Sequence, residues 1–299
     1  SLRYFWAINK FIFGESFYGY LLIPFFYTGI IYYILTVLVG RKWSLFITSV
    51  NFFTNTFDGY GLPNMKFINH INVGHAEPLA IFLLLSGLSL SLFISNSRVN
   101  SKSIFLNFLL GFVVFLSASL RPNYLPTAFF LIFFYNLFML LNNKTNYYGL
   151  FSLVGFSLIL LIPLHNYIYG NELVLISAGS HYNYNVPINT YYNVFIDILF
   201  FEYNENLKII ITQFLKWIKP LEIHYVFSVI ILFYLLIRSN PFYLKVICLL
   251  ALSQHFVLLI YEPEHRYAYL AWILNIIAVI YFIKNYIFDP ILYQYIKKK

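Results

Sequence analysis

The 299-residue chain is 61% hydrophobic and only 10% charged, and its mean hydropathy is +0.73. Roughly a quarter of the residues of a soluble globular protein are charged, so this composition excludes that class and indicates an integral membrane protein. The formal net charge of +8 does not indicate a nucleic-acid partner, because the basic residues are scattered at the ends of apolar runs and form no arginine-rich arm.

Apolar runs of membrane-spanning length recur along the chain. A helix needs ~20 apolar residues to cross the ~30 Å hydrocarbon core, and the sequence has no alternating ten-residue pattern typical of a barrel. The sequence therefore predicts an all-α, polytopic transmembrane helical bundle that forms a single domain over residues 1–299. We expect nine membrane segments: 18–40, 43–57, 77–95, 103–120, 124–141, 148–169, 221–238, 243–261 and 267–286. The segment 43–57 is short and polar, so it either packs inside the bundle or enters without crossing.

Two stretches are predicted to lie outside the hydrocarbon on the non-cytoplasmic side. Residues 1–17 have the pattern of a short juxtamembrane helix. Residues 170–220 form the only long connection, and their second half, from Tyr191 to Pro220, is amphipathic, which predicts an interfacial helix.

Alternating the nine segments across the membrane sorts the charged residues. One side receives eleven basic residues and a single acidic one, Asp289, so the positive-inside rule makes that side, and the C-terminus, cytoplasmic. The basic residues are Arg41, Lys42, Arg98, Lys102, Lys144, Arg238, Lys245, Lys284, Lys297, Lys298 and Lys299. The other ten acidic residues fall on the opposite side: Glu15, Asp58, Glu77, Glu172, Asp197, Glu202, Glu205, Glu222, Glu262 and Glu264. Acid-base chemistry is therefore expected on the non-cytoplasmic face.

Glu77 opens a predicted segment in the stretch NVGHAEPLAIFLLL. Pro78 suits the first turn of a helix and the helix dipole favours an acidic side chain there, so one interpretation is a first-turn carboxylate only. In the other interpretation Glu77 faces an external cavity as an acid-base group or, together with His75, as a metal ligand. An acidic residue at the hydrocarbon edge without an obvious neutralising neighbour is a candidate site residue. The spacing of His70 and His75 matches no specific zinc pattern.

Two further groups of ionisable residues are predicted at the same boundary. Arg121, in SASLRPNYLP, either reaches the lipid headgroups or anchors a phosphate through its guanidinium fork. The stretch YEPEHRYAYLAW places Glu262, Glu264, His265 and Arg266 in a short connection. This stretch is either a plain polar turn or part of a site that holds a phosphate and deprotonates a hydroxyl.

Other polar residues have more ordinary interpretations. Asp58, in FDGYGLP, fits a tight turn, with a catalytic role as the alternative. His165, His224 and His255 are isolated in apolar segments and are expected to form internal hydrogen bonds. Cys248 is the only cysteine, which excludes an intramolecular disulfide and a cysteine-based metal cluster.

Several stretches, taken in order, resemble the C-type membrane glycosyltransferases, in the branch of protein mannosyltransferases and lipid A aminoarabinose transferases. They are SLRYFWAINKFIFGESFYGYLL, a segment ending in Arg-Lys, GHAEPLAIFLLL, LLGFVVFLSASLRPNYL and EPEHRYAYLAW. The resemblance implies transfer of a sugar from a polyprenyl-phosphate donor to a lipid, glycan or protein acceptor, at the non-cytoplasmic face of the bacterial inner membrane. It also implies an inverting displacement and, as in some members, a divalent cation such as Mg²⁺ or Mn²⁺.

The resemblance also implies roles for individual residues. Glu77 matches the family's second acidic residue, and Arg121 matches the basic residue after the glycine-bearing helix. His265 and Arg266 match the basic group that holds the lipid phosphate. The family's main catalytic acid lies upstream of the helix that Phe13-Gly14 resembles, so we expect either a preceding segment that carries it or a degenerate relative without it.

Two other classes of protein remain as alternatives. A flippase, polymerase or transporter of lipid-linked saccharides also places arginines and acids in a membrane cavity, although the paired interrupted helices typical of many transporters are not apparent in the sequence. A non-catalytic membrane subunit that keeps the glycosyltransferase scaffold is the second alternative.

Overall fold

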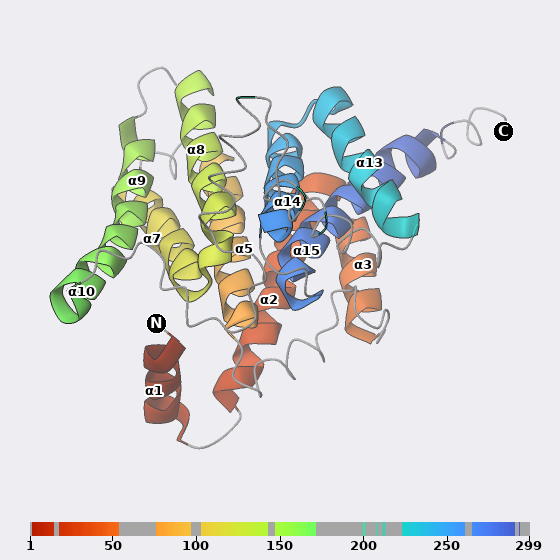
Figure 1. Ribbon diagram of the computed structural model, residues 1–299. Helices are drawn as coiled ribbons and strands as arrows, with labels where there is room; N and C mark the ends of the chain where they lie inside the picture. Colours follow the sequence, from red (N-terminus) through yellow and green to blue (C-terminus); the bar gives the residue numbers. More distant parts are fainter. Residues whose placement is uncertain are drawn as a thin grey trace.

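The computed structural model describes residues 2–14, 18–53, 76–96, 103–142, 147–171, 200, 208, 212, 223–260, 265–290 and 293. Every regular element in these residues is helical, which confirms the predicted all-α fold (Figure 1). The α-helices are α1 (Leu2–Phe13), α2 (Tyr18–Val39), α3 (Arg41–Phe53), α5 (Glu77–Ser95), α7 (Ile104–Leu120), α8 (Leu125–Asn142), α9 (Leu150–Ser157), α10 (Leu161–Gly170), α13 (Ile223–Arg238), α14 (Phe242–Ile260) and α15 (His265–Phe282). The 3₁₀-helices are η1 (Pro122–Tyr124), η2 (Tyr147–Gly149) and η3 (Leu158–Leu160), and η4 (Ile283–Phe288) is a π-helix.

Five helical stretches in the described residues are long and apolar enough to cross a membrane, as an integral membrane protein requires. They are Leu22–Val39, Glu77–Ser95, Pro122–Leu141, Tyr147–Gly170 and Tyr269–Phe288. Ile104–Leu120, Val226–Arg238 and Phe242–His255 are shorter apolar helices. The 13 residues of α3 extend over only ~20 Å at ~1.5 Å per residue. The count of nine membrane segments therefore stays a prediction.

The predicted segment 148–169 is helical but not uniform. It begins within η2 and continues through α9, η3 and α10. Pro163 lies in the first turn of α10 and has no N–H to donate to the carbonyl of Ile159, four residues earlier. Local tightening into a 3₁₀ turn at η3 is the expected response of the helix to this missing hydrogen bond.

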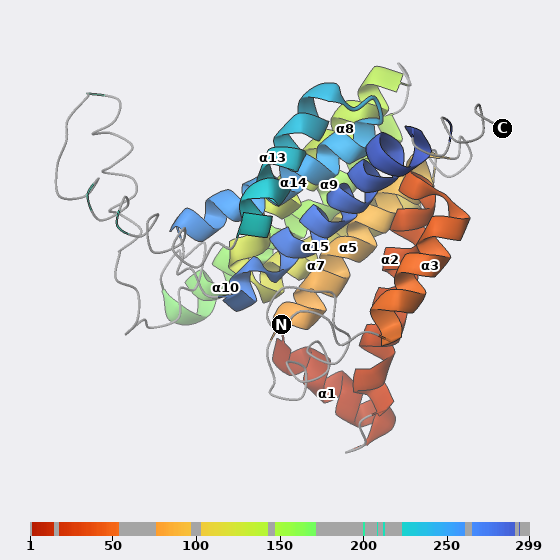
Figure 2. The ribbon, with the colours of Figure 1, turned by 90° about the vertical axis from the view of Figure 1, so that its right-hand side faces the viewer.

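The helices that carry the candidate site alternate in direction. Phe242, the first residue of α14, packs against Phe138 near the end of α8, with ring centroids 5.0 Å apart. Ser253, far along α14, lies 3.0 Å from Thr127, near the start of α8. These contacts make α14 antiparallel to α8, and α15 returns alongside α14 (Figures 1 and 2). We call the end where α5 begins and α7 ends the Glu77 end, and the opposite end the basic end.

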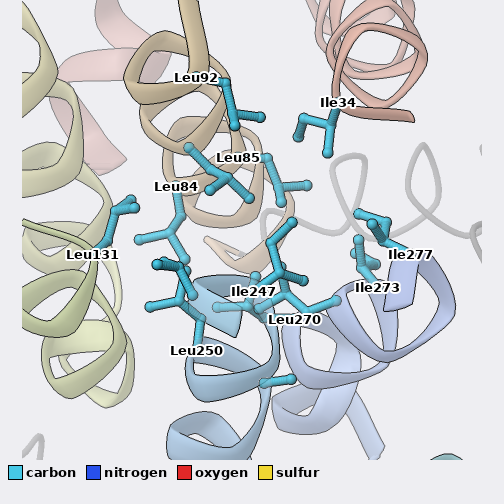
Figure 3. Packing of buried hydrophobic residues seen from close by; sticks show 14 of the residues in the cluster. Ile34, Leu84, Leu85, Leu92, Leu131, Ile247, Leu250, Leu270, Ile273 and Ile277 are labelled. Atoms are coloured by element: carbon cyan, nitrogen blue, oxygen red, sulfur yellow. The ribbon is translucent and has the colours of Figure 1, made fainter. Parts of the chain in front are cut away.

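A buried apolar cluster joins α2, α5, α7, α8, α13, α14 and α15. Lipid tails are as apolar as leucine, so within a membrane such a cluster contributes through close van der Waals packing and not through exclusion of water. Figure 3 shows side chains of this cluster from α2, α5, α8, α14 and α15 packed against one another. The labelled members are Ile34, Leu84, Leu85, Leu92, Leu131, Ile247, Leu250, Leu270, Ile273 and Ile277.

The helices α7 and α9 approach each other backbone to backbone through two glycines. A Cβ atom added to Gly111 would lie 1.9 Å from the carbonyl oxygen of Ser152. One added to Gly155 would lie 2.2 Å from the carbonyl oxygen of Phe108. Small residues at helix crossings let membrane helices pack closely, so this crossing depends on the absence of side chains at both positions.

We predict that Gly111→Ala and Gly155→Ala each lower the stability of the protein by about 1–3 kcal/mol, because the new methyl group meets fixed backbone and separates the helices. Unfolding in mixed detergent micelles measures the change. Gly29→Ala in α2 is the matched control, since no atom lies within 4 Å of its added Cβ. Equal stability of the Gly111→Ala and Gly29→Ala proteins would contradict the prediction.

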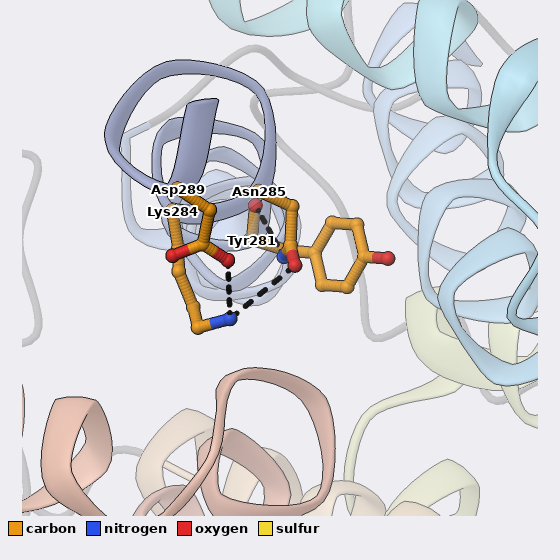
Figure 4. A network of polar contacts seen from close by, with 4 residues as sticks. All are labelled: Tyr281, Lys284, Asn285 and Asp289. Carbon is orange, nitrogen blue, oxygen red and sulfur yellow. Dashed lines mark hydrogen bonds and ion pairs between the residues drawn. The ribbon is translucent and has the colours of Figure 1, made fainter. Parts of the chain in front are cut away.

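Charged residues of the basic end include a small network in and beside η4, which follows α15. Lys284 Nζ donates to Asp289 Oδ2 at 2.9 Å and to Asn285 Oδ1 at 3.3 Å, and Asn285 Nδ2 donates to the carbonyl of Tyr281 at 2.9 Å (Figure 4). The single acidic residue predicted on this side is thus paired with a lysine. Such an exposed pair contributes little to stability.

Membrane orientation stays a prediction, and labelling of single cysteines tests it. In a Cys248→Ala background we expect Gly170→Cys, at the last residue of α10, to react with an impermeant thiol reagent on intact cells. Lys42→Cys, at the basic end, is expected to react only after permeabilisation, because the positive-inside rule places it in the cytoplasm. Both positions are exposed in the isolated chain. Labelling of both from outside would contradict the predicted orientation.

Candidate active site

Glu77 and Arg121, predicted separately from the sequence, lie together at one end of the bundle. Glu77 is the first residue of α5, followed by Pro78, and Ala76 before it provides no side-chain cap. Arg121 is the residue after α7, where the backbone becomes extended and η1 begins. Because α5 and α7 pack against each other as antiparallel neighbours, the start of one helix meets the end of the other.

The Glu77 and Arg121 side chains form an ion pair in which Arg121 Nη2 donates to Glu77 Oε1. The Glu77 side chain is 3% exposed and that of Arg121 is 22% exposed. A buried carboxylate is costly unless a cation and hydrogen bonds compensate it, and removal of one partner from such a pair typically costs about 3–5 kcal/mol. Glu77 is thus more than a first-turn carboxylate, and the neighbour that neutralises it comes from a different helix.

The backbone around the ion pair is fixed by hydrogen bonds. The Ser117 hydroxyl donates to the carbonyl of Ala80 at 2.6 Å and ties α7 to the first turn of α5. The Arg121 N–H donates to the Ser117 carbonyl at 3.0 Å, and the Tyr124 N–H donates to the Arg121 carbonyl at 2.9 Å. These bonds set the separation of the helix ends and therefore the position of the two charged side chains.

The second carboxylate oxygen of Glu77 has no such partner. Glu77 Oε2 is buried and makes no hydrogen bond, and the same holds for Asn123 Nδ2 in η1. Unpaired buried polar atoms are uncommon because each one costs about 1–3 kcal/mol. An ionised carboxylate with one oxygen held by arginine and the other unused can accept a hydrogen bond or a proton from a ligand.

Polar side chains also join the helices deeper in the bundle. Thr127 Oγ1 donates to Gln254 Oε1 at 2.9 Å, which links α8 to α14. Asn275 Nδ2, on α15, lies 2.9 Å from His255 Nε2 and 3.2 Å from Ser228 Oγ, on α14 and α13. His255 therefore forms the internal hydrogen bond expected from the sequence, with Nε2 as acceptor when its proton is on Nδ1.

The other members of this polar network were not predicted from the sequence. The available signal was an amide inside an apolar run: Gln254 in LLALSQHFVLL and Asn275 in LAWILNIIAVI. The prediction for His165 was wrong, because its side chain is exposed on α10, where its ring contacts Tyr169 with centroids 4.6 Å apart. The side chain of His224 lies outside the described residues.

The remaining predicted site residues are only partly placed. Asp58, His75, Glu262 and Glu264 lie outside the described residues, and of His265 and Arg266 the backbone alone is described. These last two begin the first turn of α15, and four residues separate the end of α14 from its start. Since α14 ends at the Glu77 end, the backbone brings the start of α15 to the same end as the Glu77–Arg121 ion pair.

A metal site has no support from the described part of the chain. Those residues contain no group of three or more His, Cys, Asp or Glu side chains that could hold an ion. One oxygen of Glu77 is already bound to Arg121, and His75 is not described. The predicted site at His75 and Glu77 for Mg²⁺ or Mn²⁺ stays a prediction.

Comparisons of this chain with protein-family models, curated proteins and solved structures find no match. A function must therefore be argued from the site itself, since a helical bundle alone does not define one. The site comprises a buried acid with an unused oxygen, an arginine bonded to it, and the backbone start of α15.

Replacement of Asn275 tests the polar network. We predict that Asn275→Ala lowers stability by about 1–2 kcal/mol, because His255 and Ser228 lose their shared partner inside the bundle. Unfolding in mixed micelles measures this loss. Asn285→Ala is the matched control, because Asn285 Nδ2 bonds the nearby carbonyl of Tyr281, four residues earlier in the chain, and not a different part of the bundle. An effect no greater than that of Asn285→Ala would show that the network adds little.

Proposed function

We propose that this chain is a membrane glycosyltransferase that moves a sugar from a polyprenyl phosphate to an acceptor at the Glu77 end of the bundle. The observation that carries the proposal is the buried Glu77 carboxylate, bonded to Arg121 through one oxygen and unused at the other. Transfer of a glycosyl group to a hydroxyl needs a carboxylate that accepts the hydroxyl proton and cations that stabilise the departing phosphate.

In the proposed reaction the acceptor oxygen attacks the anomeric carbon of the donor. The new carbon–oxygen bond forms while the bond between that carbon and the phosphate oxygen breaks, with inversion at the carbon. The proton of the acceptor passes to a carboxylate, Glu77 or the undescribed Asp58, and the electron pair leaves with the polyprenyl phosphate. The substrate would be bound by His265 and Arg266 together with Glu262 and Glu264. Arg121, for which the family resemblance implies substrate binding, is bonded to Glu77.

The membrane setting is consistent with this chemistry. A polyprenyl chain lies in the bilayer, so its phosphate lies near the boundary, where helix ends rather than helix centres can reach it. Glu77, Arg121 and the first turn of α15 are all at helix ends. The proposal places this end at the non-cytoplasmic face of a bacterial inner membrane and requires no step through a metal ion.

The polar network favours a second candidate function, transport or flipping of lipid-linked saccharides. Gln254 Nε2 and Asn275 Oδ1 are buried without a hydrogen-bond partner inside apolar helices, and polar atoms at such a depth can mark a path for a polar solute. Movement of a fluorescent lipid-linked saccharide across proteoliposomes without any acceptor would favour this candidate. A non-catalytic scaffold would support neither transfer nor movement.

Sugar transfer by the purified protein in proteoliposomes tests the enzyme proposal. With defined polyprenyl-phosphate sugars as donors, Glu77→Gln and Arg266→Ala are expected to lower transfer by about 100-fold or more, since each removes a group that acts in the transition state. Lys284→Gln, at the basic end, is the matched control and should transfer normally. Near-normal transfer by both site variants would reject these roles.

A further inference from the structure

We infer that Arg121 is a positioning residue, which keeps Glu77 ionised and turns its Oε2 oxygen toward the acceptor hydroxyl, and that it does not bind the donor phosphate. The inference rests on the proposed function, in which Glu77 receives the acceptor proton. It departs from the phosphate anchor that the family resemblance implies for Arg121. It assigns the donor phosphate to the start of α15, at His265 and Arg266.

The backbone of Arg121 is fixed, and its guanidinium is bound to Glu77 through Nη2. Its backbone N–H and carbonyl are both bonded, to Ser117 and Tyr124, and Ser117 in turn holds Ala80 of α5. Its guanidinium donates to Glu77 Oε1 at the interface of the two helices. Both helix ends would have to separate, or the side chain would have to change rotamer, before the guanidinium could leave the carboxylate.

Charge also opposes a change of partner. If Arg121 turned to a phosphate, the 3% exposed Glu77 carboxylate would lose its cation within the bundle. The phosphate would then lie beside a buried carboxylate of the same sign, which disfavours binding. A phosphate held at the start of α15 leaves the ion pair intact, and Glu77 Oε2 keeps its unused capacity to accept a hydrogen bond.

Kinetics of four proteins separate a positioning role from phosphate binding. The wild type, Glu77→Gln, Arg121→Gln and the double variant are compared for sugar transfer in proteoliposomes. If Arg121 acts through Glu77, Arg121→Gln lowers kcat by about 100-fold with little change in donor KM, and the double variant is no slower than the worse single variant. Arg121→Lys, which keeps the charge but not the planar fork, should recover part of kcat.

A raised donor KM with kcat largely retained in Arg121→Gln would overturn the inference and restore the phosphate anchor. Multiplicative effects in the double variant would also overturn it, because they would mean that the two residues act independently. Size-exclusion profiles and thermal unfolding show which variants are folded. If Arg121→Gln does not fold, Arg121→Lys carries both comparisons.

A measurement without substrate separates this inference from the proposed function. The infrared difference between wild type and Glu77→Gln, with ¹³C-labelled glutamate, reports the charge state of Glu77. A carboxylate band is expected in the wild type and a carboxylic-acid band in the Arg121→Gln background, since an unpaired buried carboxylate takes up a proton. A carboxylate band in both backgrounds would overturn the role of Arg121. Absence of transfer by the wild type, with the expected spectra, would reject the glycosyltransferase and keep the ionising role.

Discussion

Burial of a carboxylate at the edge of an apolar helical bundle is the constraint on which the candidate site depends. An ionised carboxylate in that position needs a cation beside it, and Arg121, the residue after α7, provides one. The pairing requires that α5 begins where α7 ends, at a fixed separation. The Ser117–Ala80 hydrogen bond and the turn after Arg121 supply that separation. Local electrostatics and helix packing are therefore parts of one arrangement.

In the rest of the bundle, contacts between helices must hold the helices together within the lipid bilayer. Exclusion of water contributes little between helices in a bilayer, so close backbone contacts and hydrogen bonds between helices carry more of the stability. The crossing at Gly111 and Gly155 provides close backbone contacts. The side chains of Thr127 and Asn275 provide hydrogen bonds between helices. Both kinds of contact involve helices that also form the Glu77 end, so they help to fix the positions of the helix ends at the candidate site.

The two ends differ in how their charged side chains are paired. The basic end holds an exposed lysine–aspartate pair of the kind found on many protein surfaces. The Glu77 end holds a buried acid with one carboxylate oxygen that makes no hydrogen bond, and such an unpaired atom lowers the stability of the folded protein. Such a cost is expected at sites where a ligand completes the hydrogen bonds. This contrast, and not the helical fold, is the basis of the glycosyltransferase proposal.

The sequence by itself determined the class of protein and most helix positions, because apolar runs and their polar ends depend only on local composition. The start of α5 at Glu77 was predicted to the residue, and Glu77 and Arg121 were recognised as unusual at a membrane boundary. Their ion pair was not predicted, because residues 44 positions apart meet only through the packing of α5 on α7. The links from Gln254 and Asn275 to neighbouring helices were missed for the same reason. Tertiary structure alone decides which polar groups meet, since helix rotation and crossing are set by contacts distant in the sequence.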